Sequence, residues 1–258
     1  MSDHLPATPA WPPRSAPRLF VPGPLAQDAQ VVIEGAQAHY LIRVMRTGVG
    51  DAVVLCDDVT GEWAARATHV GKRDLALTCE TLLRGREAVP DFTLCAALLK
   101  KDRFDLVLEK ACELGVARIQ PVLTHRCVAD KLNMERARAL LTEAAEQCAR
   151  TALPVLEAPV KLDALLRGWD DARPLFFADE TGGAPAAATF AAHARPDGGG
   201  SAALLTGPEG GFDEGERAAI RAHRAAHPIT LGPRILRGET ATIAATALWM
   251  GTIGDWSV

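Results

Sequence analysis

Two successive strand–loop–helix units at residues 202–250 constrain the fold of this chain more than any other feature. In the first unit, an apolar run at 202–205 leads into a loop that contains three glycines. Asp213 and Glu216 follow with the spacing of a capping box, which predicts that a helix begins there.

The second unit repeats this order further along the chain. We predict a strand at 228–231, a loop at 232–238, and a helix that opens at Glu239 and carries no charged side chain from 240 to 250. Strands alternate with helices from residue 89 onward, which is typical of a mainly parallel sheet. Such sheets bind ligands at the loops that follow the carboxyl ends of their strands, so we expect a ligand between these two loops.

The first loop favours a neutral or cationic ligand. Gly207, Gly210 and Gly211 have no Cβ, so backbone polar groups can approach a bound molecule closely. Glu209 stands where a phosphate-binding loop would carry a basic residue, and neither the Walker pattern nor Gly-x-Gly-x-x-Gly is present. The second loop adds two arginines beside an apolar Ile-Leu pair. The first loop alone would be an ordinary turn, but the pair of loops indicates a binding site.

The two loops also resemble a known signature. Residues 205–212, read as Leu-Thr-Gly-Pro-Glu-Gly-Gly-Phe, and residues 231–241, read as Leu-Gly-Pro-Arg-Ile-Leu-Arg-Gly-Glu-Thr-Ala, are similar to the ribosomal small-subunit methyltransferase E family of the SPOUT superfamily. Residues 99–103, 109–116 and 143–150 resemble further motifs of this family. The resemblance therefore covers nearly the whole chain.

This resemblance implies a fold and an activity. The implied fold is α/β, with a C-terminal SPOUT-type parallel sheet preceded by a small PUA-like β-barrel domain. A trefoil knot is implied by the resemblance alone, because general topology rules speak against knots. The implied reaction is transfer of a methyl group from S-adenosylmethionine, without a metal, to N3 of a uridine in 16S rRNA of the 30S subunit. A homodimer through the C-terminal helix, which is apolar nearly all round, is also implied.

The domain organisation follows the composition of each segment. Residues 1–17 contain five prolines and no apolar core, so we expect a mobile tail. Residues 18–88 hold short strand patterns separated by glycines, which predicts a small β-barrel. Within it, residues 18–21 and the pattern at 39–51 resemble the family's PUA-like RNA-binding domain. A charged linker ending in proline leads into the methyltransferase domain at 89–258.

The resemblance also assigns residues to roles. It implies a donor-binding wall made of Phe177, Leu205, Gly207, Pro208, Glu209, Gly210, Leu231, Gly232, Ile235, Leu236 and Thr240. It implies RNA contacts at Arg18, Arg43, Arg46, Lys100 and Arg103.

Two residues are predicted to be catalytic. N3 of neutral uracil carries a proton that a base or water must accept, while cations stabilise charge on the flanking carbonyl oxygens. Arg150 is predicted at the end of a helix spanning about 134–150, where the helix dipole favours a cation that could hold uracil oxygens or phosphate. Glu209 could accept the N3 proton or hold its loop, and the loop role is favoured. Arg237 and Glu239 could form a structural ion pair.

Composition sets limits on other functions. The net charge of −4 does not by itself predict nucleic-acid binding. The six cysteines lack metal-binding spacing, so we expect reduced, buried thiols in a cytoplasmic protein. His223 and His227 could share a helix face, but no third ligand lies nearby and no metal site is predicted. No run is long and apolar enough to span a membrane.

Alternative functions stay open at this point. A SPOUT enzyme that methylates ribose 2′-OH of rRNA or tRNA is the nearest, although such enzymes usually carry a Ser-Leu-Asn turn where this chain has residues 236–240. A non-catalytic RNA-binding assembly factor is a second alternative. A nicotinamide-dependent oxidoreductase is disfavoured, since no dinucleotide fingerprint follows the first α/β strand.

Overall fold

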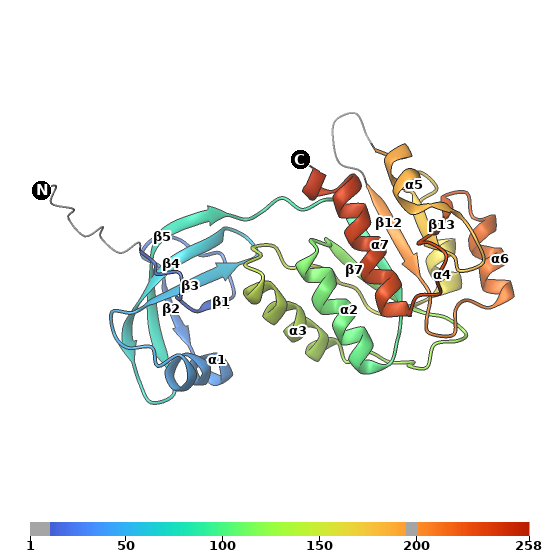
Figure 1. The fold of residues 1–258 in the computed structure, drawn as a ribbon. Coiled ribbons are helices and arrows are strands. Elements are labelled where there is room, and N and C mark those ends of the chain that lie inside the picture. Colours follow the sequence, from blue (N-terminus) through green and yellow to red (C-terminus); the bar gives the residue numbers. More distant parts are fainter. Residues whose placement is uncertain (1–10, 195–200, 258) are drawn as a thin grey trace, which may run out of the picture. The chain divides into compact units, whose positions relative to one another are not determined.

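The computed structural model describes residues 11–194 and 201–257, and the described chain forms two compact units (Figure 1). The first unit comprises the chain up to Ala88 together with a separate segment, Glu146–Ala152. The second comprises Val89–Ala145 and the chain from Leu153 onward. The division after Ala88 coincides with the linker that the sequence indicates. The sequence did not indicate that the short segment 146–152 packs with the first unit.

The first unit is built on one five-stranded sheet with a strand order of β1-β3-β4-β5-β2. β1 pairs with β3 in parallel and the other pairs are antiparallel. A short helix continues directly into a π-helical turn between β2 and β3. The elements are β1 (Arg18–Phe20), β2 (Gln30–Ile33), α1 (Gly35–His39), η1 (Tyr40–Val44), β3 (Ala52–Asp57), β4 (Gly61–Val70) and β5 (Leu75–Gly85).

Apolar residues that alternate along these strands form the core of the first unit. Val53 and Leu55 of β3 meet Leu75 and Leu77 of β5 in one buried cluster, and Leu41 of η1 covers it. The alternation appears because successive side chains of a strand point to opposite faces of the sheet.

The N-terminal tail is partly described. Residues 1–10 of the predicted mobile tail lie outside the described residues. Trp11 is described, and the guanidinium of Arg66 lies 3.9 Å from the centre of its ring, the geometry of a cation–π contact.

The second unit is an eight-stranded parallel sheet within the described residues, with an order of β11-β13-β10-β12-β6-β7-β8 and β9 paired beside β7. Its strands are β6 (Phe92–Ala97), β7 (Arg118–Leu123), β8 (Val155–Leu156), β9 (Val160–Lys161), β10 (Leu175–Ala178), β11 (Ala184–Pro185), β12 (Ala202–Thr206) and β13 (Ala226–Thr230). Its helices are α2 (Lys101–Glu113), α3 (Met134–Gln147), α4 (Leu162–Arg167), α5 (Ala186–Ala192), α6 (Glu214–Ala222), α7 (Gly238–Thr252) and η2 (Asp255–Ser257).

Helices cover both faces of this sheet, as a parallel sheet requires. On one face, Leu162 of α4 and Ile220 of α6 pack on Phe177 of β10. On the other face, Trp249 of α7 stacks on Phe92 of β6 with ring centres 4.1 Å apart. Figure 1 shows α2 and α7 running beside each other over that face. The strands are therefore buried on both sides and appear as continuous apolar runs in the sequence.

The strand order is not the order of the chain. β12 lies between β10 and β6, and β13 lies between β10 and β11, which are consecutive in sequence. The β10–β11 connection thus crosses β13, and a Cβ at Gly183 would lie 2.6 Å from the backbone nitrogen of Ile229. The knot itself stays a prediction.

Three local predictions are wrong. The helix predicted to reach Arg150 ends at Gln147, because Ala149 takes a left-handed φ of 59° that a helix cannot contain. His223 and His227 do not share a helix face, since α6 ends at Ala222 and His227 lies in β13.

The third error concerns the start of α2. The sequence predicts a helix capped by Asp102, but the N-cap is Lys100 and Asp102 lies in the first turn. An acid in the first turn still interacts favourably with the helix dipole.

The six cysteines differ in their exposure to solvent. Four cysteines are buried, Cys127 is half-buried and Cys148 is exposed, and all six are free thiols.

Within the described residues, no helix combines the length and the apolarity needed to cross a membrane.

Candidate functional site

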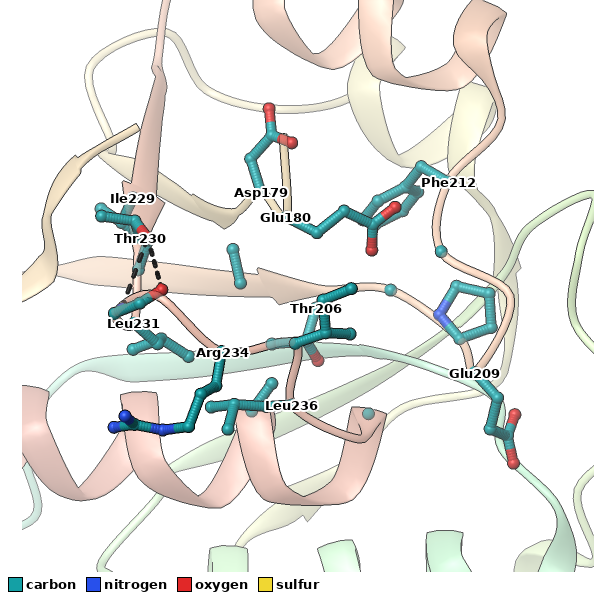
Figure 2. A pocket seen from close by; sticks show the side chains of 18 of the residues that line it. Asp179, Glu180, Thr206, Glu209, Phe212, Ile229, Thr230, Leu231, Arg234 and Leu236 are labelled. Carbon is teal, nitrogen blue, oxygen red and sulfur yellow. Dashed lines mark hydrogen bonds between the residues drawn. The ribbon is translucent and has the colours of Figure 1, made fainter. Parts of the chain in front are cut away.

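A pocket of about 160 Å³ lies at the carboxyl ends of β10, β12 and β13 (Figure 2). This is the edge at which parallel sheets bind ligands. The residues that line it are Ala178, Asp179, Glu180, Thr206, Gly207, Pro208, Glu209, Gly211, Phe212, Ile229, Thr230, Leu231, Gly232, Pro233, Arg234, Ile235, Leu236, Gly238 and Ala241.

The first glycine loop, residues 206–212, is shaped by its own packing. Gly211 has φ +65°, and a Cβ there would overlap the carboxylate of Glu180. A Cβ at Gly207 would lie 2.9 Å from the ring of Phe212. These glycines are therefore required by the loop itself as well as by any ligand that approaches it.

Neighbouring segments hold this loop in place. The backbone N–H of Lys100 donates to Oε1 of Glu209 at 3.1 Å, and Figure 2 shows that the Glu209 side chain points away from the pocket. Arg126 donates from Nη1 to the carbonyl oxygen of Gly210 at 2.9 Å. Arg126 also donates to the carbonyl oxygen of Phe212 at 3.5 Å, so residues after β6 and after β7 both bond to the loop.

The second loop, residues 231–237, has fewer such bonds. Among the described residues, the carbonyl oxygen of Arg237 accepts the first bond of α7, from the N–H of Ala241 at 2.8 Å, and the Thr230 hydroxyl contacts the backbone of Gly232 at 3.4 Å. Ile235 is 91% exposed, and Arg234 and Arg237 reach no described carboxylate. The predicted pair of Arg237 with Glu239 does not form.

Glu239 instead pairs with Arg103 of α2, whose Nη1 lies 3.0 Å from its Oε1. The Nε of Arg103 also lies 4.0 Å from Oε1 of Glu209. Arg103 therefore sits between the first loop and the start of α7.

The two loops meet at the start of α7. The hydroxyl of Thr242 donates to the hydroxyl of Thr206 at 2.8 Å, in a buried position. A Cβ at Gly238 would lie 3.3 Å from the carbonyl oxygen of Gly207. Residues of both loops therefore line one pocket.

The predicted donor-binding residues differ in where they lie relative to the pocket, and their role stays a prediction. Phe177 and Leu205 are fully buried beneath the pocket and do not line it. Gly210 and Thr240 adjoin the lining without belonging to it. The predicted residues that do line it are Gly207, Pro208, Glu209, Leu231, Gly232, Ile235 and Leu236.

Sequence reasoning missed two carboxylates in the pocket wall, those of Asp179 and Glu180, each of which is paired with an arginine. They follow β10, and the sequence could not show that this strand lies between β12 and β13. The Asp179 side chain is fully buried; burial raises its pKa, but hydrogen bonds from Thr181 and Arg221 outweigh that effect and leave the pKa below its usual value. Arg217 donates from Nη2 to Oε1 of Glu180 at 2.7 Å.

The predicted catalytic Arg150 belongs to the first unit. Its side chain is 4% exposed, and its Nε lies 3.5 Å from Oε1 of Glu87. It is not among the residues that line the pocket. Its role in catalysis stays a prediction.

The predicted RNA contacts fall into two groups. Arg18 and Arg103 are engaged by carboxylates, Arg18 through Glu62 at 2.8 Å. Arg43, Arg46 and Lys100 are exposed and have no ion-pair partner in the described part of the chain. The second group is therefore free to contact a polyanion.

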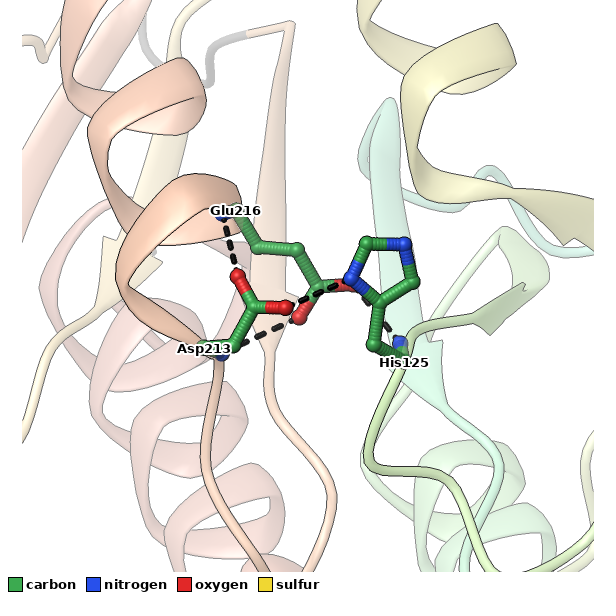
Figure 3. A group of neighbouring side chains, drawn as sticks. All are labelled: His125, Asp213 and Glu216. Carbon is green, nitrogen blue, oxygen red and sulfur yellow. Dashed lines mark hydrogen bonds and ion pairs between the residues drawn. The ribbon is translucent and has the colours of Figure 1, made fainter.

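His125, Asp213 and Glu216 form a cluster whose ligand atoms lie within 4.8 Å of one another (Figure 3). The backbone N–H groups of Glu216 and Asp213 donate to the two carboxylates at 2.7 and 3.1 Å, which is the predicted capping box. His125 adds a backbone bond to Glu216 at 2.8 Å and a ring bond from Nδ1 to Asp213 at 2.5 Å. The carboxylates thus serve the helix start, and the cluster is an extended cap.

Comparison with known proteins supplies context. A family model described as an RNA methyltransferase domain matches residues 86–250, and one described as an RNA methyltransferase PUA domain matches residues 33–78. Ribosomal RNA small subunit methyltransferase E of Synechocystis is 31% identical, over 89% of this chain and 76% of that protein. The protein of the same name from Rickettsia conorii is 27% identical, over 89% of this chain and 93% of that protein.

Two similar solved structures contain S-adenosylmethionine. A methyltransferase of Legionella pneumophila is 27% identical with a TM-score of 0.82, over 93% of this chain and 99% of that one. Ribosomal RNA small subunit methyltransferase E of Neisseria gonorrhoeae is 25% identical with a TM-score of 0.79, over the same shares of the two chains.

Proposed function

Because this chain belongs to the ribosomal RNA small subunit methyltransferase E family, we propose that it methylates N3 of a uridine in 16S rRNA, with S-adenosylmethionine as the donor. The observation that carries this proposal is the pocket between the two glycine loops. The pocket lies in a unit whose relatives from Legionella and Neisseria bind the same donor.

The pocket suits this donor chemically. The second loop supplies apolar side chains for the adenine, and the backbone of the first loop is open to polar contacts. Methyl transfer from a sulfonium is a direct displacement for which we propose no metal, so positioning supplies most of the acceleration. The walls of the pocket are the residues that perform this positioning.

The N3 proton is proposed to leave to water or to Glu209. The bond from Lys100 to Glu209 supports the loop-holding role, because the carboxylate is already engaged and points away from the pocket. Arg150 is proposed to hold uracil oxygens or phosphate. Only the family resemblance supports this role of Arg150. The argument from the helix dipole does not apply, since Arg150 does not end a helix.

A basic groove supports the proposed RNA substrate. In the first unit, His39 and Arg43 of the α1–η1 segment and Lys72 and Arg73 of the β4–β5 turn line an open groove of about 520 Å³. The three cations among them, Arg43, Lys72 and Arg73, have no acidic partner among the described residues. Unpaired cations along a groove are suited to contact RNA phosphates.

A homodimer is proposed through α7. Thr240, Ala244 and Leu248 recur on one exposed stripe of this helix, which carries no charge along it. Uncharged faces of this kind suit a symmetric contact between two copies. Light scattering at micromolar concentration should give the mass of a dimer. We also retain the expectation of a cytoplasmic location, where an rRNA substrate would be met.

Methylation of purified 30S subunits and of naked 16S rRNA, followed by nucleoside analysis, tests the proposal. We expect 3-methyluridine to form with labelled donor. Label in a 2′-O-methyl nucleoside would support the ribose methyltransferase alternative. Absence of transfer and of donor binding would support the non-catalytic assembly factor.

A further inference from the structure

Glu180 presents one free carboxylate oxygen to the pocket. It follows β10 directly, and Figure 2 shows its carboxylate directed toward the first loop and Phe212. Oε1 accepts from Nη2 of Arg217 at 2.7 Å, while no described donor reaches Oε2. The side chain is 48% exposed, and Gly211 packs directly against its carboxylate.

The surrounding charges determine what kind of group this carboxylate can bind. Asp179 is held by Arg221 at 2.6 Å and lies 3.4 Å from the Nε of Arg217. Two carboxylates and two guanidiniums therefore balance on this wall. A charge-neutral wall gives little extra attraction to an ammonium or sulfonium group, whereas its acceptor oxygen favours a neutral hydrogen-bond donor.

The geometry points to Glu180 as the residue that recognises the vicinal ribose hydroxyls of the methyl donor, an inference that rests on the proposed function. A carboxylate accepts from two adjacent hydroxyls without losing its bond to Arg217, because it has about four lone-pair sites. In this arrangement the adenine packs on the apolar side chains of the second loop, on the other side of the pocket. Glu180 thereby fixes the sugar between the polar wall of the pocket and the apolar side chains of the second loop.

Calorimetry on the full chain with paired ligands tests this inference. The ligands are S-adenosylhomocysteine, 5′-methylthioadenosine, which lacks the amino-acid end, and the 2′-deoxy and 3′-deoxy forms of 5′-methylthioadenosine. The variants are E180Q, which keeps an acceptor for Arg217, and E214Q, a control at an exposed glutamate of α6. Thermal melts of each variant verify that the fold is retained.

We expect E180Q to weaken 5′-methylthioadenosine about 10- to 100-fold, the effect of a hydrogen bond to a charged group. Each deoxy ligand keeps one of the two hydroxyls, so E180Q should weaken it clearly less than it weakens 5′-methylthioadenosine, because one of the two bonds is already missing. E214Q should bind all ligands like the wild type. A purely structural role of Glu180 would weaken the deoxy ligands equally.

Three results would overturn the inference. They are unchanged binding of 5′-methylthioadenosine by E180Q, an equal loss with the deoxy ligands, and a loss confined to S-adenosylhomocysteine, which would assign Glu180 to the amino-acid end. If the wild type binds none of these ligands, the proposed function itself fails, and this is distinguishable from failure at Glu180 alone.

Discussion

The two loops of the pocket differ in how they are held. The first, residues 206–212, receives bonds from the end of β6, from Arg126 after β7 and from Arg217 of α6, which donates to the carbonyl oxygen of Phe212 at 3.3 Å. The second, residues 231–237, is held among the described residues by the first helical bond of α7 at Arg237 and by a weak contact between Thr230 and Gly232, and its Ile235 side chain is almost fully exposed. Both loops follow parallel strands of the same sheet, so the difference lies in their neighbours.

This contrast suggests a division of roles. A loop held from three sides keeps its backbone groups at fixed positions, which is what alignment of a reactive methyl group requires. A loop with few bonds is free to close over a ligand and bury apolar side chains against it. We therefore expect the first loop to set the geometry and the second to respond to binding.

The largest effect is expected at Gly211. An alanine there would be strained by φ +65° and would overlap the Glu180 carboxylate, so either the loop or this carboxylate of the pocket wall must shift. We expect G211A to lower donor affinity at least about 100-fold, equivalent to about 2.7 kcal/mol.

The matched control is G232A in the second loop. Gly232 also has positive φ, at +107°, but nothing lies within 4 Å of its would-be Cβ, so this loop can relax. We expect a loss of about 10-fold or less. Equal losses at Gly211 and Gly232, measured by calorimetry, would remove the distinction between the loops.

Glu209 tests whether the first loop is held or does chemistry. E209A removes the acceptor for the Lys100 N–H and should weaken donor binding about 10-fold. E209Q keeps an acceptor oxygen and should stay within about 3-fold of the wild type. If Glu209 instead accepts the N3 proton, E209Q should slow methyl transfer as strongly as E209A, by about 100-fold or more at unchanged donor affinity.

Ile235 tests closure of the second loop. Because the side chain is 91% exposed without ligand, I235A should leave the melting temperature unchanged. Burial of the side chain against a bound donor should make I235A bind about 5- to 10-fold more weakly. V128A, at another exposed apolar residue, is the control. A fall in melting temperature with unchanged affinity would reverse this interpretation.

The smallest effect is a pH dependence at His125. The hydrogen bond to Asp213, together with the nearby charges of Glu216 and Asp213, raises the pKa of His125 above 6.5, and the same contact lowers the pKa of Asp213. A raised folded pKa means that the stabilisation is complete below pH 6.5 and is lost as the pH rises through the folded pKa.

The melting temperature of the wild type should therefore exceed that of H125Q most below this pH. The gap should narrow as the pH rises, because the imidazole loses its charge. A gap that is constant or widens with pH would show that the charge of His125 does not contribute.

Much of the fold could be predicted because its signals are local. The capping box at Asp213, the strand at 175–178 and the helix at 162–167 each depend on side chains within a few residues. The helix end before Arg150 could not be predicted, because a non-glycine residue, Ala149, takes the left-handed conformation there.

The site was predictable only along its two loops. Their glycines indicated the site, but Glu180 and Arg126 reach it from strands whose order in the sheet follows no local signal. The pairing of Glu239 with Arg103 was missed for the same reason, because the two residues lie far apart in sequence.

Hydrogen exchange with and without S-adenosylhomocysteine tests the central claim most directly, because it follows both loops in one measurement. The account predicts slow exchange in residues 207–212 in both states and strong new protection in residues 232–237 on binding. Protection gained outside both loops, or equally fast exchange of the two loops without ligand, would contradict it.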